Sequence, residues 1–386
     1  MGQPMAASAA APTEPSVSCL VVSRTAALLN RLVVSLRRAR RFWHDGDELL
    51  VSWNGDPEEE ARVLPAAAPP LRMAQRSPYH FASNINALVQ QARGDLVVLL
   101  NDDLILDPGS LDRAIQILLS RPDTGVVGGR LRTSDGRLGH AGILFSNQCL
   151  PYNRFRPDRL GHLIDPDDLA VQESGAMPAV TGALMVMRRD DVRALRLREN
   201  FSVCGEDVAL CLDLRHQLGK HAYYASDVTA IHDEKSTRGD SLDHYDLLQV
   251  ARLVEERLRL DPALRARQAY WSTQEADVLE AIVHRLREEN ARSKEDRTAQ
   301  LALLHRLEND TARWKQESEA ELAWLQGQLD EARARKQESE AELAWLQGQL
   351  DGTRARLELV ERSRSWRLTA PCRRRGRWLQ GRRPSS

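Results

Sequence analysis

Three groups of polar residues have the types and the order along the chain that metal-assisted group transfer requires. An Asn-Asp-Asp triplet at residues 101–103 directly follows the apolar run VVLL, Glu206 and Asp207 open a predicted helix, and His232 follows a strand-like segment. A carboxylate and an imidazole can share a divalent cation such as Mn²⁺ or Mg²⁺, which stabilises charge on a diphosphate leaving group. A second carboxylate can accept the proton of an attacking hydroxyl. These residues therefore indicate transfer of a group from a nucleotide-diphosphate donor to an alcohol.

Each group also has a structural explanation when it is considered alone. Acidic residues such as Glu206 and Asp207 are common at helix starts, where they cap the helix and complement its dipole. A single histidine at a strand end, such as His232, is more often structural than a ligand. The assignment of chemistry therefore depends on the joint order of the three groups along the chain.

The acids of the triplet are not explained by the helix that follows them. In the stretch LDPGSLDRAIQILLSRP, Asp107 is predicted to cap the helix, Pro108 to take its first position and Pro122 to end it. Asp102 and Asp103 come one turn too early for this role.

Strand-like and helix-like segments alternate from residue 17 to about residue 240. This alternation predicts an α/β fold with a mostly parallel sheet and helices on both faces. Ligands of such sheets bind at the carboxyl ends of the strands, which is where residues 101–103 lie. The clearest strand-like segments are VSCLVVS, DELLVSW, DLVVLLN and GVVGGRLR, and the clearest helix-like segments are ALLNRLVVSLRRAR and NINALVQQAR.

Composition narrows the classes of partner and the compartment. The net charge of −1 gives no reason to expect nucleic-acid binding. Five cysteines without a CxxC pair favour a reducing compartment over a disulfide framework. No apolar run approaches the ~20 residues of a membrane span, and the start of the chain lacks the pattern of a signal peptide. We therefore expect a cytoplasmic, soluble protein.

The C-terminal part of the sequence contains an internal repeat. The segment KQESEAELAWLQGQLD occurs at residues 315–330 and again, unchanged, at residues 336–351. The offset equals three heptads, and the leucines alternate three and four apart, which predicts a coiled coil and a homo-oligomer with a dimer as the default. Lys315 and Lys336 fall at a positions, in the apolar seam between the helices, and weaken the coiled coil. A single solvated helix is the alternative.

The last residues form a basic tail with interleaved tryptophans. This tail is a candidate for peripheral contact with an anionic membrane, and a solvated terminus is the simpler interpretation. The predicted parts of the chain are a disordered tail at 1–15, an α/β domain at 16–262, a coiled coil at 270–362 and the basic tail at 363–386, which contains Trp366 and Trp378.

With these motifs in order, residues 17–239 resemble the family 2 glycosyltransferases, which have the GT-A fold. The stretches that carry the resemblance are RGDLVVLLNDDLILDPGSL, GVVGGRLRTSDGRLGHAGILF, AVTGALMVMRR, GEDVALCLDLR and IHDEKSTRG. The sequence looks closest to bacterial members that build O-antigen, capsule or other surface polysaccharides. The resemblance implies inverting transfer from a nucleotide-sugar donor to a glycan or lipid-linked acceptor.

The resemblance also implies roles for individual residues. Asp103 and His232 match the residues that hold a divalent cation, and Asp207 matches the general base, with Glu206 beside it. Arg238, in the stretch KSTRGDS, is a candidate clamp for a phosphate. The residues expected to bind the nucleotide sugar are Ser23, Trp53, Asn54, Asn86, Asp102, Thr181, Gly182, Ala183 and Arg238.

Two departures from the family pattern concern the donor. Trp53 stands where members usually have an aspartate that contacts the base, so the tryptophan either stacks on a base or marks an altered site. The first strand ends in LVVSRT where members have a pattern like IIPTYN. An inactive, sugar-binding scaffold organised by the coiled coil is therefore the alternative to the enzyme. A nucleotidyltransferase is disfavoured because the first strand lacks a glycine-rich phosphate loop.

Overall fold

A computed structural model describes residues 14–155, 164–232, 243–292 and 297–362 of the chain. The chain divides into two compact units, Met1–Glu321 and Leu322–Ser386. Among the described residues, no helix is both long enough and apolar enough to cross a membrane.

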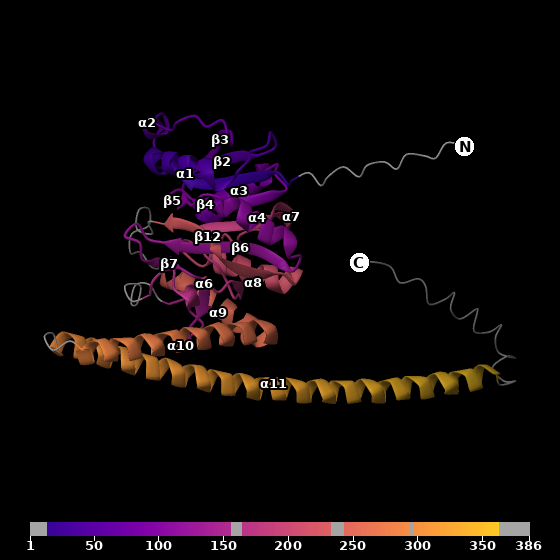
Figure 1. Cartoon of the computed structure of the whole chain (residues 1–386). Coiled ribbons are helices and arrows are strands. Elements are labelled where there is room, and N and C mark those ends of the chain that lie inside the picture. The colour runs from indigo at the N-terminus through magenta and orange to yellow at the C-terminus, as the bar shows by residue number, and fades with distance from the viewer. Residues whose placement is uncertain (1–13, 156–163, 233–242, 293–296, 363–386) are drawn as a thin grey trace, which may run out of the picture. The chain divides into compact units, whose positions relative to one another are not determined.

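The first unit is built around one large mixed sheet (Figure 1). Its described strands follow the order β10-β12-β6-β11-β4-β1-β2-β3, while β5 pairs with β12 and β7 pairs with β6. A separate pair is formed by β8 and β9. The strands are β1 (Val17–Ser23), β2 (Glu48–Trp53), β3 (Leu71–Arg76), β4 (Leu96–Asn101), β5 (Leu104–Leu106), β6 (Thr124–Arg132), β7 (Leu138–His140), β8 (Ile143–Phe145), β9 (Pro151–Asn153), β10 (Gly175–Met177), β11 (Leu184–Arg188) and β12 (His221–His232).

The direction of the strands confirms the predicted α/β class and adds one reversal. Strands β1, β2, β3 and β4 pair in parallel, as the alternation of strands and helices predicted. Strand β11 lies between β4 and β6 and is antiparallel to both. Strand β12 is parallel to β6 but antiparallel to β10 and β5, so the sheet is mixed.

Helices cover both faces of the sheet, and alternate side chains of each strand serve opposite faces. Leu20 and Val22 of β1 belong to the cluster beneath α3, α7 and α8, whereas Cys19 and Val21 belong to the cluster beneath α1 and α4. The helices are α1 (Ala26–Ala39), α2 (Pro57–Glu60), α3 (Phe81–Gln91), α4 (Ser110–Ser120), α6 (Leu169–Gln172), α7 (Arg189–Leu195), α8 (Glu206–Leu218), α9 (His244–Leu260), α10 (Pro262–Arg292) and α11 (Arg297–Arg362).

The first unit extends well beyond Asp261, because α10 packs against it. The indole Nε1 of Trp271 donates to the Ala176 carbonyl at 2.8 Å, and the Gln268 side chain bonds the backbone N–H and C=O of Phe145. Leu304 and Leu307 of α11 are buried in the same core cluster. Thus α10 and the first part of α11 belong to the first unit, and not to a separate coiled coil starting at residue 270.

The start of α4 differs from the prediction that Asp107 caps it. The helix begins at Ser110, and its N-cap is Gly109, which has a φ of 76°. The Asp107 carboxylate instead accepts hydrogen bonds from Thr229 and Arg132. The short strand β5 comes directly before Asp107, and its pairing with β12 draws the aspartate towards that strand.

A buried aspartate fixes the loop that precedes α8. Asp246 of α9 is fully buried, and its carboxylate accepts backbone N–H groups from Ser202, Val203 and Cys204 at 2.6 to 3.2 Å. Such charge-assisted bonds are about twice as strong as neutral ones. Asp246 therefore sets where the chain enters α8.

We expect Asp246→Ala to lower the free energy of unfolding by roughly 3 kcal/mol, because it leaves three backbone donors without their acceptor. Urea denaturation would measure the change. Asp243→Ala is a matched control, since Asp243 only caps the partly exposed start of α9, and its loss should cost about 1 kcal/mol. Equal effects of the two substitutions would contradict the role given to Asp246.

Candidate active site

A carboxylate and an imidazole meet at the carboxyl ends of the central strands. In the antiparallel pairing of β5 with β12, His232 lies opposite Leu104, which places it beside Asp103. The Nε2 atom of His232 lies 3.2 Å from Oδ1 of Asp103, and the two residues are 8% and 4% exposed. The structure therefore brings together the two residues predicted to bind a cation.

The same imidazole nitrogen also lies 3.3 Å from Nδ2 of Asn101. One ring nitrogen cannot donate to Asp103 and accept from Asn101 at the same time. A cation bound by the carboxylate and by the unprotonated ring nitrogen would remove this conflict. Within the described part of the chain, the buried Nδ1 of His232 has no hydrogen-bond partner. Asp103 and His232 thus fit one edge of a divalent-cation site, with the remaining positions left for phosphate oxygens and water.

No group of three or more His, Cys, Asp or Glu residues suited to a metal ion occurs among the described residues.

Asp102 points to a different partner from its neighbour. Its Oδ2 accepts a hydrogen bond from the Ser23 hydroxyl at 2.7 Å, across the ends of β1 and β4. Burial raises the pKa of Asp102 to about 6; the bond from Ser23 lowers it, and the charge of Asp103 raises it. Two buried acids in sequence, one bonded to Ser23 and one beside His232, concentrate negative charge that a cation would neutralise.

Asp207 contacts the turn that precedes β11. Its Oδ2 accepts the backbone N–H of Gly182 at 2.8 Å, and its Oδ1 accepts the N–H of Val208 at 2.7 Å. A Cβ at Gly182 would lie 3.1 Å from the Cβ of Asp207, so the glycine permits this close approach. Each carboxylate oxygen keeps a further lone pair, with which Asp207 can accept a bond from a hydroxyl.

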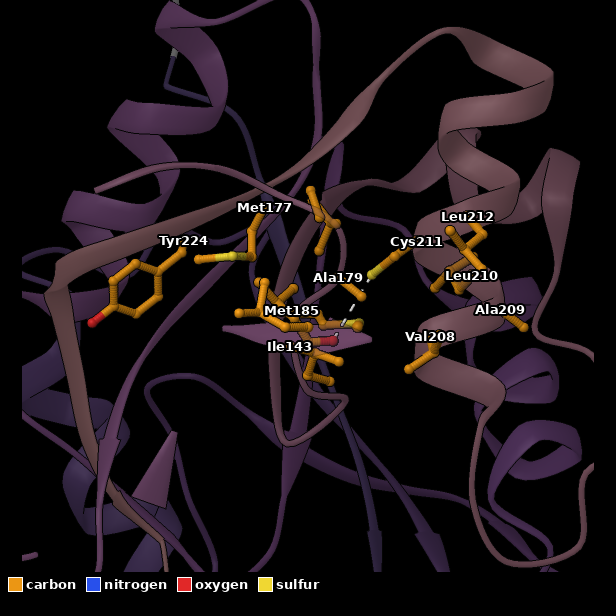
Figure 2. Close-up of a cluster of buried hydrophobic side chains, with 14 of the residues drawn as sticks. Ile143, Met177, Ala179, Met185, Val208, Ala209, Leu210, Cys211, Leu212 and Tyr224 are labelled. Atoms are coloured by element: carbon orange, nitrogen blue, oxygen red, sulfur yellow. Dashed lines mark hydrogen bonds between the residues drawn. The ribbon is translucent and has the colours of Figure 1, made fainter. Parts of the chain in front are cut away.

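The position of Asp207 depends on how α8 is seated. Figure 2 shows side chains of this helix, among them Val208 and Cys211, beside the cluster formed by Ile143, Met177 and Met185. The Sγ of Cys211 lies 3.8 Å from the carbonyl of Val180. Val180 comes directly before the turn that leads into β11. Packing along α8 therefore fixes its first turn against that turn.

A turn formed by residues 181–183 joins the two halves of the site. The Asn101 N–H donates to the Ala183 carbonyl at 3.0 Å, while Gly182 bonds Asp207. Glu206, predicted beside the base, is 5% exposed at the start of α8. The structure thus connects the predicted residues Ser23, Asp102, Asp103, His232, Ala183, Gly182, Thr181, Asp207 and Glu206 in one region at the strand ends.

Three residues predicted to bind the donor serve the fold instead, in whole or in part. Trp53 is only 2% exposed and packs in the core beneath α1, which leaves no ring face for a base. Asn86 is also 2% exposed, and its amide bonds the N–H and C=O of Leu197 and the Glu199 carboxylate. Asn54 donates to the Ser77 carbonyl and is partly exposed. Arg238 lies outside the described residues.

The sequence prediction missed His140. Its Nε2 accepts N–H groups from Gly142 at 3.2 Å and from Thr181 at 3.4 Å, and its Nδ1 lies 2.8 Å from Oδ1 of Asn153. This arrangement requires a neutral ring protonated at Nδ1. Burial lowers the pKa of His140 to about 4; the bond to Asn153 raises it, and His232 lowers it. Only the tertiary fold reveals this support for the 181–183 turn.

Residues 15–252 match the family model described as "Glycosyltransferase like family 2". The O-antigen biosynthesis protein RfbC of Myxococcus xanthus is 30% identical over 238 residues, which cover 60% of this chain and 18% of that protein. The uncharacterized protein y4gI of Sinorhizobium fredii is 31% identical over 171 residues, or 42% of this chain and 18% of that protein. The chain thus spans less than a fifth of either relative.

Two solved structures are similar at low sequence identity. The mannosyltransferase PcManGT from Pyrobaculum calidifontis, in complex with GDP-Man and Mn²⁺, has a TM-score of 0.44 and 15% identity, with 82% of this chain and 88% of that chain covered. S. aureus TarS 1–349 has a TM-score of 0.43 and 14% identity, with 68% of this chain and 70% of that chain covered.

The buried histidine predicts a pH dependence of stability. His140 is harder to protonate in the folded state than in the unfolded state, so stability is full above pH ~6.5 and falls towards pH 4, by roughly 3 kcal/mol. We expect His140→Gln to lose less stability than the parent between pH 7.5 and pH 4.5 in urea denaturation. His216→Gln, at an exposed position, is the control. Parallel curves for parent and His140→Gln would refute the prediction.

Asn86 provides a test of its structural role. Asn86→Ala should lower the free energy of unfolding by about 2–4 kcal/mol, because it leaves the buried backbone groups of Leu197 unpaired. Asn30 is a matched control, since its amide bonds Arg62 and Leu64 at the surface, and Asn30→Ala should cost less than ~1 kcal/mol. Unchanged stability of Asn86→Ala with weaker nucleotide binding would restore the role predicted from the sequence.

Proposed function

The chain belongs to the family 2 glycosyltransferases, and from this premise we propose that it transfers a sugar from a nucleotide-diphosphate donor to a hydroxyl acceptor, with inversion at the anomeric carbon and with a divalent cation. The name of its relative RfbC, an O-antigen biosynthesis protein, supports a role in bacterial cell-surface polysaccharide or glycoconjugate synthesis.

One observation carries the proposal. Asp103 lies beside His232, which faces Asn101; Asn101 bonds the 181–183 turn, and that turn bonds Asp207. The candidate cation pair and the candidate base are thus connected through one short turn. This connection supports a displacement in which the diphosphate leaves beside Asp103 and His232 and the attacking hydroxyl approaches Asp207.

Asp103 and His232 would hold the cation, Mn²⁺ or Mg²⁺. When bound, it would neutralise charge on the departing diphosphate. The buried Asp102 and its Ser23 partner keep the carboxylates in place, since Ser23 ties Asp102 to the end of β1. The burial of this region keeps the local dielectric low, which strengthens every charge interaction there.

Asp207 would accept the proton of the acceptor hydroxyl. Its carboxylate lies in the first turn of α8, where backbone N–H groups and the helix dipole stabilise negative charge. The backbone N–H groups of Gly182 and Val208 donate to this carboxylate and orient it. Thr181 and Ala183 would form the floor beneath the donor sugar.

The acceptor would be a glycan or a lipid-linked saccharide. We place the enzyme in the cytoplasm, peripherally at the inner face of the membrane when it meets a lipid-linked acceptor. The basic tail at 363–386, which lies outside the described residues, would supply contact with anionic lipids. The repeated segment in α11 would hold the enzyme as a homo-oligomer.

A second function is favoured by one specific observation. Trp53 replaces a residue that contacts the base in the family pattern, and its burial removes the ring from any ligand. A chain that no longer binds the donor would serve as a sugar-binding scaffold. Titration with UDP, GDP and dTDP sugars, with and without Mn²⁺, separates the two functions. Metal-dependent binding of one nucleotide class, with release of the nucleoside diphosphate, supports the enzyme; no binding by folded protein supports the scaffold.

Substitution of the two acids should separate the proposed roles. Asp207→Asn should lower turnover about 10²–10⁴-fold while donor binding is retained, because an amide cannot accept the proton of the attacking hydroxyl. It also loses one of the two backbone N–H bonds that the carboxylate accepts. Asp103→Ala should instead weaken metal-dependent donor binding itself. The measurements are release of nucleoside diphosphate and calorimetric donor binding.

Asp190→Asn is a matched control, since Asp190 also lies in the first turn of a helix, α7, but its side chain is 84% exposed. It should leave both measurements unchanged. Equal, mild effects at Asp103 and Asp207 would refute the assignment of their roles.

A further inference from the structure

The second unit exposes a regular apolar seam. Leu322, Leu343, Leu346 and Leu350 are between 44% and 62% exposed on a continuous helix. Apolar residues spaced three and four apart form one stripe of an α-helix, and such a stripe is stable when a second helix covers it. The a positions are Leu322, Leu329, Lys336, Leu343 and Leu350, and the d positions are Leu325, Ala332, Ser339 and Leu346.

The charges that flank this seam are arranged in two blocks. Arg333 and Arg335 occupy the e and g positions of one heptad, and Glu340 and Glu342 occupy the e and g positions of the next. Within the helix these residues make only exposed ion pairs, such as Arg335 with Glu331 at 3.2 Å, which are weak and easily exchanged. Charges at e and g set partner choice and orientation in coiled coils.

From this pattern we infer that the second unit pairs with a second copy of this chain as an antiparallel two-stranded coiled coil, in which Lys336 faces the partner's Ser339. The inference deepens the homo-oligomer of the proposed function and rests on it. In this register Leu329 faces the partner's Leu346, and Leu325 faces the partner's Leu350, so leucines of one repeat pack on leucines of the other.

The flanking charges select this register among the antiparallel ones. Arg333 then faces the partner's Glu340, and Arg335 faces the partner's Glu342; symmetry repeats each pair. A shift of one heptad in one direction would place Arg333 and Arg335 opposite their own copies. A shift in the other direction would place Glu340 and Glu342 opposite theirs. Both shifts replace attraction by repulsion across the seam.

A parallel pairing in register uses the same residues less well. Arg335 would face the partner's Glu340, but Arg333 and Glu342 would face glutamines. Lys336 would face the partner's Lys336 in the centre of the seam, where two ammonium groups repel each other. The leucines are covered in either orientation, so the charges decide between them.

Disulfide cross-linking of the full-length chain tests the orientation. Leu329→Cys and Leu346→Cys variants would be prepared separately, one with a size tag, then mixed and oxidised gently, with the parent chain as control for its own cysteines. In the inferred pairing, the mixture forms a tagged–untagged cross-link, while each variant alone forms none above the parent. The reason is that position 329 faces the partner's position 346, so position 329 and the partner's position 329 lie 17 residues apart along the helix, about 25 Å. The same separation holds for position 346.

Self-cross-linking of each single variant would overturn the inference in favour of parallel chains in register. A monomeric mass by light scattering, without any cross-link, would overturn it as well. The readout needs neither donor nor turnover, so an inactive chain that cross-links as expected refutes only the proposed enzyme.

Charge reversal provides a second measurement that does not depend on cysteine. Arg333→Glu with Arg335→Glu should weaken the dimer roughly ten- to a hundredfold, because attractive pairs become repulsive ones. Adding Glu340→Arg with Glu342→Arg should restore it. Failure of this rescue, with helix content unchanged by circular dichroism, would contradict the inferred register.

Discussion

The candidate site depends on the pairing of one short strand, β5, with the end of β12. This pairing sets His232 opposite Leu104 and hence beside Asp103. Strand β12 reaches that point after a break in its register with β6, between Ala225 and Thr229. The break requires Gly129, because a Cβ there would lie 2.3 Å from the Val228 carbonyl oxygen. The irregularity in β12 and Gly129 in the neighbouring strand β6 thus determine where the imidazole of His232 lies.

The other half of the site depends on close packing at the start of α8. Gly205, with a φ of 107°, turns the chain into the helix, and Gly182 leaves room for Asp207 against the turn. Asp246 holds the preceding loop through its backbone N–H groups. The bond between Asn101 and Ala183 connects this half to the strand ends. Each of these contacts is made by the backbone or by a buried group. The carboxylates of Asp103 and Asp207 are therefore fixed relative to each other before any ligand binds.

The places of Asp103 and Asp207 in the fold could be predicted from the sequence because their signals are local. Asp103 follows an apolar strand and Asp207 opens a helix, so pattern and spacing were sufficient for these positions. The roles of Trp53 and Asn86 could not be predicted, because a tryptophan or an amide beside a strand or helix can face a ligand or the core, and only tertiary packing decides. The antiparallel direction of β11 could not be predicted for a similar reason, because an apolar run does not encode the direction of its strand. His140 gave no signal, because its bonds to Asn153, Gly142 and Thr181 form only when the fold brings the 181–183 turn to the imidazole.

The helical part of the sequence was harder to divide, because one composition serves two purposes. Up to Glu321, α11 buries Leu304 and Leu307 in the core of the first unit, on a face that also includes Trp314. In the second unit Leu322, Leu343, Leu346, Leu350 and Leu357 are instead between 44% and 62% exposed. Because buried leucines of the first unit and exposed leucines of the second occur in stretches of the same composition, the sequence alone did not show where the first unit ends.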